Sequence, residues 1–440
     1  MIELAAVGGY SEVGRNMTAV KIGNDVVVLD IGLHMENYIH ATNDEDVLNI
    51  SAELLIKSES VPNVDSIRDW EGKVSLIIPS HAHLDHVGGI PYLCGRYPKA
   101  DILAAPFTAA VLRNILNEEK IRIRNKIKTL DVNARYMQSD EVKVEFINIT
   151  HSTPQSIIVA IHTKQGIILY ANDFKFDLYP VIGKKPDFAK LRLMGDKGVL
   201  ALIIDSTYAG WYQKMPSESV ARQLLRDVLL GADNKGRAII VTTFSSHIAR
   251  LKSIVELGIK LDRKVVFLGR SLAKYVAAAR DTGIADFTAN VEVVKFKRQV
   301  SRRLKRIMKE GKDRYLIVMT GHQGEPNSSL YRLAHDELDF RLDPGDHVIF
   351  SCRTIPTPTN IANREYLEKL LTKKGARIFR DIHVSGHSAR EDAREMISLV
   401  RPKHIIPAHA PLEMTSKMAE LAYEMGYAEH KKYKYSPVAV

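Results

Sequence analysis

Three histidines and one aspartate lie within a single short segment of the sequence, His81-Ala82-His83-Leu84-Asp85-His86. The apolar run Val74-Ser75-Leu76-Ile77-Ile78 precedes the segment and predicts a buried strand. Side chains two apart in an extended chain lie on the same side, so the first two histidines are expected to point together. Imidazole nitrogens and carboxylate oxygens bind divalent metals. The segment therefore predicts a metal site, with too few ligands of its own to close one.

Other polar residues stand directly after apolar strands, as this segment does. The sequence predicts strands that end close to Asp30, His151, Asp173 and Asp205, and a late strand over residues 403–407 that ends at His409. Polar residues gathered at strand ends are the usual way in which a packed sheet presents an active site. Each of His151, Asp173 and His409 alone also fits a cap or turn residue.

Two metal ions can share these residues if one carboxylate bridges them, and each ion then keeps an open position for water. Histidine-rich ligation suits zinc, with manganese as the second choice. Asp30 and Asp205 are expected to orient ligands through hydrogen bonds. We assign His81, His83 and His151 to the first ion, Asp85, His86 and His409 to the second, and Asp173 to the bridge.

The composition is that of a globular protein with a basic surplus. The chain has 440 residues, 45% of them hydrophobic and 26% charged, with a net charge of +10 and a pI of about 9.3. The surplus favours a polyanionic partner. No membrane-spanning run and no leader sequence is apparent, which predicts the cytoplasm. Two cysteines, Cys94 and Cys352, support neither a disulfide framework nor a thiolate metal site.

The middle of the chain repeats a strand, a loop and a helix, which predicts a small α/β domain. Its loops are rich in Gly and Ser, at Thr243–His247, Gly269–Ser271 and Thr320–Pro326. Helix N-termini with small residues favour phosphates, although each loop also fits an ordinary N-cap. We expect residues 210–355 to form a domain inserted into a first domain made of residues 1–209 and 356–440.

The densest basic stretch is Lys295–Arg306, where Val300, Leu304, Ile307 and Met308 fall on one helical face. Two interpretations stay open: a helix with a solvated basic face, or the same helix in contact with phosphates. The stretch Ile121–Lys128 has the same ambiguity.

The segment His81–His86, with Asp30, His151 and Asp173, resembles the metallo-β-lactamase fold. The insertion, followed by Ser385-Gly386-His387 and His409, resembles the β-CASP branch of nucleases. Within that branch the chain is similar to the ribonuclease J family, in its shorter archaeal form. Three motifs carry this last resemblance: Gly8-Gly9-Tyr10-Ser11-Glu12-Val13-Gly14-Arg15-Asn16, Thr243-Phe244-Ser245-Ser246-His247 and Thr320-Gly321-His322-Gln323-Gly324-Glu325-Pro326.

The resemblance implies a four-layer αββα fold with an inserted α/β β-CASP domain. It implies two zinc ions per chain, with manganese or magnesium as alternatives. The implied activity is 5′-to-3′ exonucleolysis of single-stranded RNA in decay or maturation, with a preference for 5′-monophosphate ends and occasional endonucleolytic cuts. It also suggests a homodimer and RNA-decay or helicase partners.

The resemblance further assigns roles residue by residue. His387 matches the family's general acid to the leaving 3′ oxygen, and Asp205 the acidic residue that orients it. Asp85 lies in the catalytic segment, and His383 is expected to contact the scissile-side phosphate. The residues expected at the 5′-phosphate or the adjacent backbone are Ser245, Ser246, His247, Arg270, Ser385, Gly386 and His387.

Two features depart from the family pattern. The chain ends at Val440, so the additional C-terminal domain of the bacterial proteins is expected to be absent. The last ligand is followed by Ala410-Pro411, where the family usually has Gly-Glu, so the backbone there is expected to differ.

Three rival functions fit part of the sequence. The first is an endonuclease of RNA 3′-end processing or a DNA-repair relative, which Thr320–Pro326 and the retained His409 disfavour. The second is a thioester hydrolase of the same fold, which needs neither the insertion nor the basic surplus. The third is a non-enzymatic RNA-binding protein, which needs no metal ligands.

Overall fold

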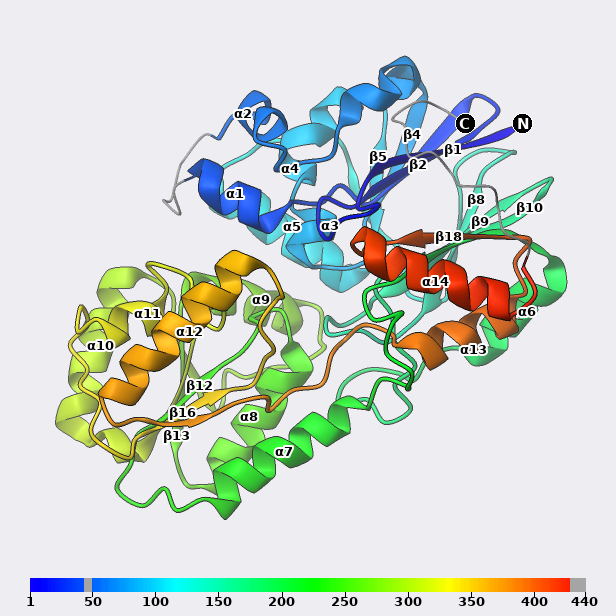
Figure 1. Cartoon of the computed structure of the whole chain (residues 1–440). Helices are drawn as coiled ribbons and strands as arrows, with labels where there is room; N and C mark the ends of the chain where they lie inside the picture. The colour runs from blue at the N-terminus through cyan, green and yellow to red at the C-terminus, as the bar shows by residue number, and fades with distance from the viewer. Residues whose placement is uncertain (43–49, 428–440) are drawn as a thin grey trace. The chain divides into compact units, whose positions relative to one another are not determined.

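The computed structural model describes residues 1–42 and 50–427, which form two compact units (Figure 1). Unit 1 contains Met1–Leu178, Lys184–Met215 and the chain from Gly386 onward, and unit 2 contains Tyr179–Gly183 and Pro216–Ser385. The chain therefore leaves unit 1, builds unit 2 and returns. No helix within the described ranges has the length and apolarity needed to cross a bilayer.

The first sheet of unit 1 has six strands in the order of the sequence. The first two pairings are antiparallel and the remaining three are parallel. Its central strands are almost wholly buried and consist largely of β-branched and leucine residues, as expected when both faces of a sheet are covered. The strands are β1 (Ile2–Gly8), β2 (Met17–Ile22), β3 (Asp25–Leu29), β4 (Val74–Ile78), β5 (Asp101–Ala104) and β6 (Ile127–Thr129).

The second sheet of unit 1 also has six strands, and its edge strand comes from the end of the chain. That last strand pairs in parallel with β11, with Ile203 opposite Ile406, and β11 pairs in parallel with β10. The other pairings are antiparallel. In spatial order the strands are β18 (His404–Ala408), β11 (Val199–Asp205), β10 (Gly166–Ala171), β9 (Ile157–Thr163), β8 (Lys143–Asn148) and β7 (Arg135–Met137).

Alternating residues of β11 show how unit 1 is layered. Ile203 belongs to a core shared by the two sheets, which also holds Leu76 and Phe146. Leu202 and Ile204 face the other way, into a core with α6, α13 and α14. On the first sheet, α5 packs against β5 and β6. Helix, sheet, sheet and helix therefore follow one another, which confirms the expected four-layer αββα arrangement.

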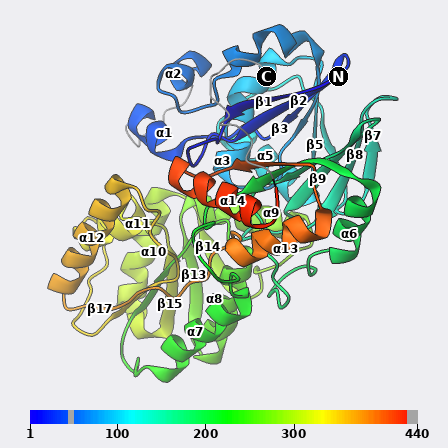
Figure 2. The same cartoon turned by 45° about the vertical axis from the view of Figure 1, so that its right-hand side comes forward.

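The helices of unit 1 are mostly short on the side of the first sheet and longer on the side of the second. In Figure 1 the red α14 lies beside β18, and in Figure 2 the orange α13 lies near α14 and α6, against which it packs. The helices are α1 (Met35–Thr42), α2 (Ala52–Lys57), α3 (Leu84–Val87), α4 (Ile90–Leu93), α5 (Pro106–Glu118), α6 (Phe188–Lys197), α13 (Arg390–Val400) and α14 (Leu412–Glu424), with 3₁₀ turns at Val64–Lys73 and Cys94–Arg96.

Unit 2 is built on a single sheet of six strands, all parallel, in the order β14-β13-β15-β12-β16-β17. The sequence predicted strands at the positions of β12, β13 and β15 and did not identify β14, β16 or β17. The expected boundary at residue 355 falls between β16 and α12, whereas the sheet of unit 2 continues through β17. The strands are β12 (Ile239–Thr242), β13 (Lys264–Leu268), β14 (Val291–Val294), β15 (Tyr315–Met319), β16 (His347–Phe350) and β17 (Arg377–Phe379).

Helices cover both faces of this sheet. One core joins alternate strand residues such as Ile240 and Ile317 to α10, α11 and α12. On the other face α8 and α9 pack against β13, and α7 packs against α8 (Figure 1). The helices are α7 (Glu218–Gly231), α8 (Ile248–Lys260), α9 (Arg270–Asp281), α10 (Lys297–Glu310), α11 (Ser329–Ala334) and α12 (Pro358–Lys373), with a 3₁₀ turn at Lys312–Arg314.

Candidate metal centre

The predicted metal ligands meet in unit 1 at the carboxyl ends of its strands. His81 and His83 lie in the loop after β4, and Asp85 and His86 in α3, which begins directly after that loop. The other three residues follow three different strands of the second sheet: His151 follows β8, Asp173 follows β10 and His409 follows β18. Residues that lie far apart in the sequence, each close to the end of a strand, therefore form one site.

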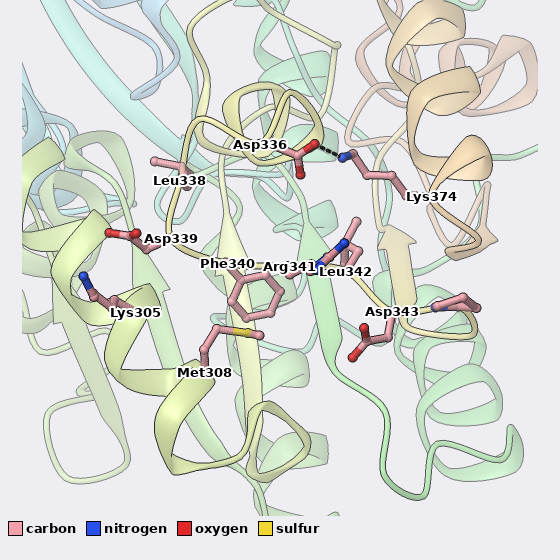
Figure 3. A pocket seen from close by; sticks show the side chains of 11 residues that line it. Lys305, Met308, Asp336, Leu338, Asp339, Phe340, Arg341, Leu342, Asp343 and Lys374 are labelled. Carbon is pink, nitrogen blue, oxygen red and sulfur yellow. Dashed lines mark hydrogen bonds and ion pairs between the residues drawn. The ribbon is translucent and has the colours of Figure 1, made fainter.

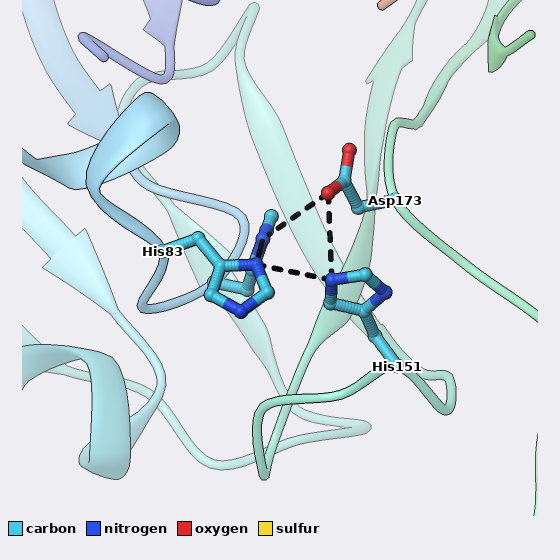
Figure 4. A group of neighbouring side chains, drawn as sticks. His83, His151 and Asp173 are labelled. Atoms are coloured by element: carbon cyan, nitrogen blue, oxygen red, sulfur yellow. Dashed lines mark hydrogen bonds and ion pairs between the residues drawn. The ribbon is translucent and has the colours of Figure 1, made fainter. Parts of the chain in front are cut away.

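One group of potential ligands comprises His81, His83, His151 and Asp173 (Figure 4). The Nε2 atoms of His81 and His151 lie 3.0 and 3.1 Å from Nδ1 of His83, and both lie 3.4 Å from Oδ2 of Asp173. Ligand atoms on a tetrahedral zinc ion, at bonds of about 2.0–2.1 Å, are roughly 3.3 Å apart. These spacings fit a single ion.

The second group comprises Asp85, His86 and His409. Nε2 of His86 lies 3.5 Å from Oδ2 of Asp85, and Nε2 of His409 lies 3.7 Å from the same oxygen. Both nitrogens also face Oδ1 of Asp173, at 3.4 and 3.5 Å. The two oxygens of Asp173 therefore face different groups, as a bridging carboxylate requires.

Asp173 is the clearest sign that the centre is built for a metal. Its side chain is 1% exposed, yet neither carboxylate oxygen accepts a hydrogen bond. A buried ionised carboxylate that has only imidazole nitrogens beside it, the nearest at 3.4–3.5 Å, and no hydrogen bond, is costly unless it coordinates a metal. Its backbone is held in the left-handed region, at φ 48°. The histidine-rich donor set suits zinc.

The far nitrogens of three ligands are held by neighbouring acceptors. Nδ1 of His86 lies 2.7 Å from Oδ2 of Asp30, which also accepts a hydrogen bond from the Tyr170 hydroxyl at 2.8 Å. Nδ1 of His409 lies 2.9 Å from Oδ1 of Asn16. Nδ1 of His151 lies 2.8 Å from the Gly386 carbonyl. With Nδ1 held in this way, each Nε2 faces the centre and is the nitrogen that would bind a metal.

Burial and nearby charges set the protonation states of the ligands. Burial holds the pKa of His81, His83 and His151 below the ordinary value for histidine, so these rings are neutral. Burial raises the pKa of Asp173, but the imidazoles of His409 and His86 outweigh it and hold that pKa well below its usual range. Neutral imidazoles and an ionised carboxylate are the forms that bind metals. Burial opposes protonation of His86, but the carboxylates of Asp173, Asp85 and Asp30 outweigh it and raise the pKa of that ring well above its ordinary value, so His86 releases a proton when a metal binds.

His387 lies at the margin of the same centre. Its Nδ1 lies 2.9 Å from Oδ2 of Asp205, and its Nε2 lies 3.8 Å from Oδ2 of Asp173. Burial opposes protonation of the ring, but the carboxylates of Asp173 and Asp205 outweigh it and raise the pKa of His387 to about 10. Thr207 donates a hydrogen bond of 2.6 Å to the other oxygen of Asp205, which fixes that carboxylate.

The residues predicted to bind the 5′-phosphate are divided between the units. Ser245, Ser246 and His247 lie in the loop between β12 and α8, where His247 also caps α8 by accepting from the Arg250 N–H at 3.2 Å. Arg270 is exposed in the first turn of α9. The remaining members are His383 and Ser385, at the end of unit 2, and Gly386 and His387, at the return to unit 1.

Sequence reasoning missed the residue that organises the unit 2 loops. Arg250 is completely buried and pairs with the buried Glu218 at 2.6 Å. Its guanidinium also donates to the Ser351 carbonyl at 2.8 Å and the Ile382 carbonyl at 3.2 Å. Burial, aided by the Arg250 charge, lowers the pKa of His383 to about 2, so that ring is neutral.

Other residues missed from sequence surround the metal centre. Asn16 is 1% exposed and accepts from Asn172 at 3.2 Å in addition to contacting His409. Ser80 donates its backbone N–H to Asp30 at 2.6 Å. Asn16 ends the motif that starts at Gly8, and that motif was the one signal available for it.

Three family models match successive parts of the chain. Residues 11–205 match the metallo-β-lactamase superfamily, residues 235–370 the β-CASP domain of ribonuclease J, and residues 374–433 a Zn-dependent metallo-hydrolase RNA specificity domain. Together they cover most of both units.

Curated relatives match along nearly the whole chain. Ribonuclease J of Methanocaldococcus jannaschii is 42% identical over 428 residues, which is 97% of this chain and 95% of the relative. Ribonuclease J of Pyrococcus abyssi is 40% identical, over 97% of this chain and 94% of the relative. Ribonuclease J of Synechocystis is 30% identical, and the match covers 97% of this chain but 63% of that longer protein.

A solved structure agrees with the fold. A protein of unknown function from Enterococcus faecalis superposes with a TM-score of 0.62 at 18% identity, over 94% of this chain and 95% of its own.

Proposed function

Because the chain belongs to the ribonuclease J family, we propose that it is a zinc-dependent 5′-to-3′ exoribonuclease that prefers 5′-monophosphate ends. The single observation that carries the proposal is Asp173, a buried carboxylate with no hydrogen-bond partner, set between two groups of metal ligands. Such an arrangement suits hydrolysis of a phosphodiester.

Two zinc ions are the occupancy that the donor set supports best. One would be held by His81, His83 and His151, the other by Asp85, His86 and His409, with one oxygen of Asp173 for each. Zinc at such a site polarises the phosphodiester and lowers the pKa of a nucleophilic water. Asp30, Asn16 and the Gly386 carbonyl each hold Nδ1 of one ligand ring, so that Nε2 of that ring points towards the metal centre.

His387 is the residue that we propose protonates the leaving 3′ oxygen. A general acid must hold its proton at neutral pH and lie beside the reacting atoms. The carboxylates of Asp205 and Asp173 provide the first condition, because they raise the pKa of the ring. Its Nε2 provides the second, because it faces Asp173 while Nδ1 is held by Asp205.

Unit 2 would supply recognition of the RNA. Ser245, Ser246 and Ser385 offer hydroxyl donors, and Arg270 offers a guanidinium that can bind a phosphate in bidentate fashion. The neutral His383 donates or accepts without adding a charge. Arg250 holds the segment around His383, because it bonds the carbonyl of Ile382.

The activity is tested with RNAs of one sequence that carry a 5′-monophosphate, a 5′-triphosphate or a 5′-hydroxyl, each labelled at either end. The zinc-loaded protein should release mononucleotides from the monophosphate RNA first. Internal cutting of all three at equal rates, without mononucleotide release, contradicts the exonuclease and favours an endonuclease. Thioester turnover in place of RNA turnover contradicts both.

The expected homodimer, the RNA-decay or helicase partners and the cytoplasmic location stay predictions. Light scattering on the full chain tests the first, because a dimer doubles the mass.

A further inference from the structure

Helix α10 concentrates most of the surplus positive charge of the chain. Its sequence, KRQVSRRLKRIMKE over Lys297–Glu310, has seven basic residues and one acidic residue, a net charge of +6. The whole chain has a net charge of +10. One helix of unit 2 therefore carries more than half of the surplus that predicts a polyanionic partner.

Four of these cations form a line along the exposed side of the helix. Val300, Leu304 and Ile307 are buried in the core of unit 2. At 100° per residue, the four side chains opposite them fall within about 60° of one another, and the first and last lie about 16 Å apart along the axis. We call these the α10 stripe: Arg298, Arg302, Lys305 and Lys309, all exposed.

The α10 stripe lacks the acidic partners that cations on other helices have. None of its members forms an ion pair with any residue that the structure describes, whereas Arg303 and Arg306 of the same helix both pair with Glu310. On α12, Arg364 pairs with Glu368 at i,i+4. Like charges at this spacing repel each other, so the stripe costs stability that a bound anion would offset.

The first turn of α10 adds to this cost. It carries Lys297 and Arg298 and no acidic residue, and the N-cap Phe296 makes no side-chain hydrogen bond. A helix N-terminus favours negative charge, so cations there are unfavourable. Local rules that a sequence breaks without compensation within the fold are expected at functional surfaces.

The surroundings of the α10 stripe exclude two other occupants. A cavity of about 750 Å³ adjoins it through Lys305 and Met308 (Figure 3). Its lining has three carboxylates, of Asp336, Asp339 and Asp343, which offset its three cations, of Lys305, Arg341 and Lys374, so the cavity itself offers no net positive charge to a phosphate. A membrane-surface helix must insert its apolar face. That face of α10 is already buried against Ile240 and Ile317.

We propose that the α10 stripe is a second RNA-binding surface, which holds the phosphate backbone of the substrate without regard to sequence. The proposal rests on the proposed ribonuclease function and adds a contact in unit 2 beyond the candidate 5′-phosphate residues. Four cations spread along about 16 Å can contact several phosphates of one strand. Because these contacts need a long RNA, their contribution depends on substrate length.

The test is the quadruple variant Arg298→Gln, Arg302→Gln, Lys305→Gln and Lys309→Gln in the full chain. Its affinity for a 30-nucleotide single-stranded RNA, measured in an Asp85→Ala background to prevent cleavage, should fall at least tenfold. The slope of log affinity against log salt should become shallower by about 2 to 3, at roughly 0.7 per phosphate contact. In the zinc-loaded enzyme with Asp85 intact, KM for the long RNA should rise, while turnover of a 5′-phosphorylated trinucleotide should stay within twofold.

A matched control removes the same charge elsewhere. Lys57, Lys99, Lys235 and Lys403 are exposed and lie on separate elements. Changing all four to Gln should alter the salt slope by less than half as much as the stripe variant does. Equal losses in the two variants overturn the proposal in favour of overall charge. The double variant Arg298→Lys, Arg302→Lys keeps the positive charge of the stripe. An affinity for RNA equal to that of the unaltered chain in this variant supports the proposal.

Two further outcomes are decisive. An unchanged KM for long RNA in the stripe variant overturns the inference while the proposed function stands. Loss of RNA binding in the stripe variant, with no RNA cleavage by the unaltered chain, refutes the function while the stripe stands. If the unaltered chain binds vesicles of anionic phospholipid and only that binding is lost in the variant, the surface serves a membrane and the inference is wrong.

Discussion

The metal centre of unit 1 and the Arg250 cluster of unit 2 (Arg250, Glu218 and the backbone carbonyls that Arg250 bonds) are both buried and both charged. They differ in whether the protein itself satisfies the buried charge with hydrogen bonds. In unit 2 the guanidinium of Arg250 meets Glu218 and three backbone carbonyls, so the fold itself satisfies the charge. In unit 1 the carboxylate of Asp173 accepts no hydrogen bond. A satisfied buried charge fixes loops, whereas the unsatisfied carboxylate of Asp173 lies among histidine ligands, where a metal would satisfy it.

The largest expected effect comes from neutralising Asp173. Asp173→Asn keeps the shape but removes the charge shared by both ligand groups, so kcat/KM for RNA should fall by about 10³ or more, given that a metal contributes several kcal/mol to the transition state. The same variant should lose the zinc-induced rise in Tm, which in the unaltered protein reflects about 2.7 kcal/mol at a hundredfold excess of zinc over Kd.

The control for Asp173 is another buried acid of unit 1. Asp392 accepts backbone N–H groups from Met215 and Ala389, at 2.7 and 3.0 Å. Asp392→Asn should lower Tm but leave the zinc-induced rise intact. A zinc response in Asp173→Asn equal to that of the unaltered protein contradicts the bridging role.

The second effect tests whether the Arg250 cluster is structural. Glu218→Gln leaves a buried guanidinium without its counter-charge, which should cost about 3–5 kcal/mol in the free energy of unfolding. Denaturant unfolding measures this loss. The double variant Glu218→Gln, Arg250→Met should recover part of it. The more exposed pair Arg222–Glu256 in the same unit, with side chains 45% and 34% exposed, is the control, and Glu256→Gln should cost less than about 1 kcal/mol.

The third effect concerns the residues around the metal ligands. Asn16→Ala removes the acceptor that holds Nδ1 of His409, so zinc affinity should fall about 10–100-fold. Competition with a fluorescent chelator measures the change. An unaltered affinity means that His409 is aimed by its own backbone, which lies at φ 56°, and that Asn16 serves only the packing.

The smallest effect is a shift in pH dependence. The carboxylates of Asp173 and Asp205 raise the pKa of His387 to about 10, so a general acid there keeps its proton below that pH and loses it above. Asp205→Asn removes one carboxylate and should move the alkaline limb of log kcat/KM towards lower pH. At pH 8.5 the loss should be about tenfold, and near pH 6 it should be much smaller. An unshifted limb contradicts the role of His387.

The sequence predicted the parts of the molecule that depend on short-range pattern. The ligand segment from His81 to His86 could be recognised because all its donors are close together and follow an apolar strand. The candidate residues Asp173 and His409 could be recognised because each follows a strand in the same way. The four-layer order came from the family resemblance and not from periodicity.

The remaining parts depend on contacts that the sequence does not record. Asn16 meets His409 across almost the entire chain, and apart from the family motif that it ends, no local pattern distinguishes it from an ordinary turn residue. Arg250 lies on an amphipathic helix, where an arginine normally faces water, yet tertiary packing buries it completely. The strand β17 is three residues long, too short for a periodic signal.

The pairing of β18 with β11 also has a consequence for synthesis of the protein. Ile203 on β11 lies opposite Ile406 on β18, so the ribosome must translate about 200 residues between them, which takes roughly 10–40 s at 5–20 residues per second. Until then the nascent chain has His81 to His86 and Asp173 but lacks His409. A nuclease assembled in this way acquires its full set of ligands only when its own messenger has been almost completely read.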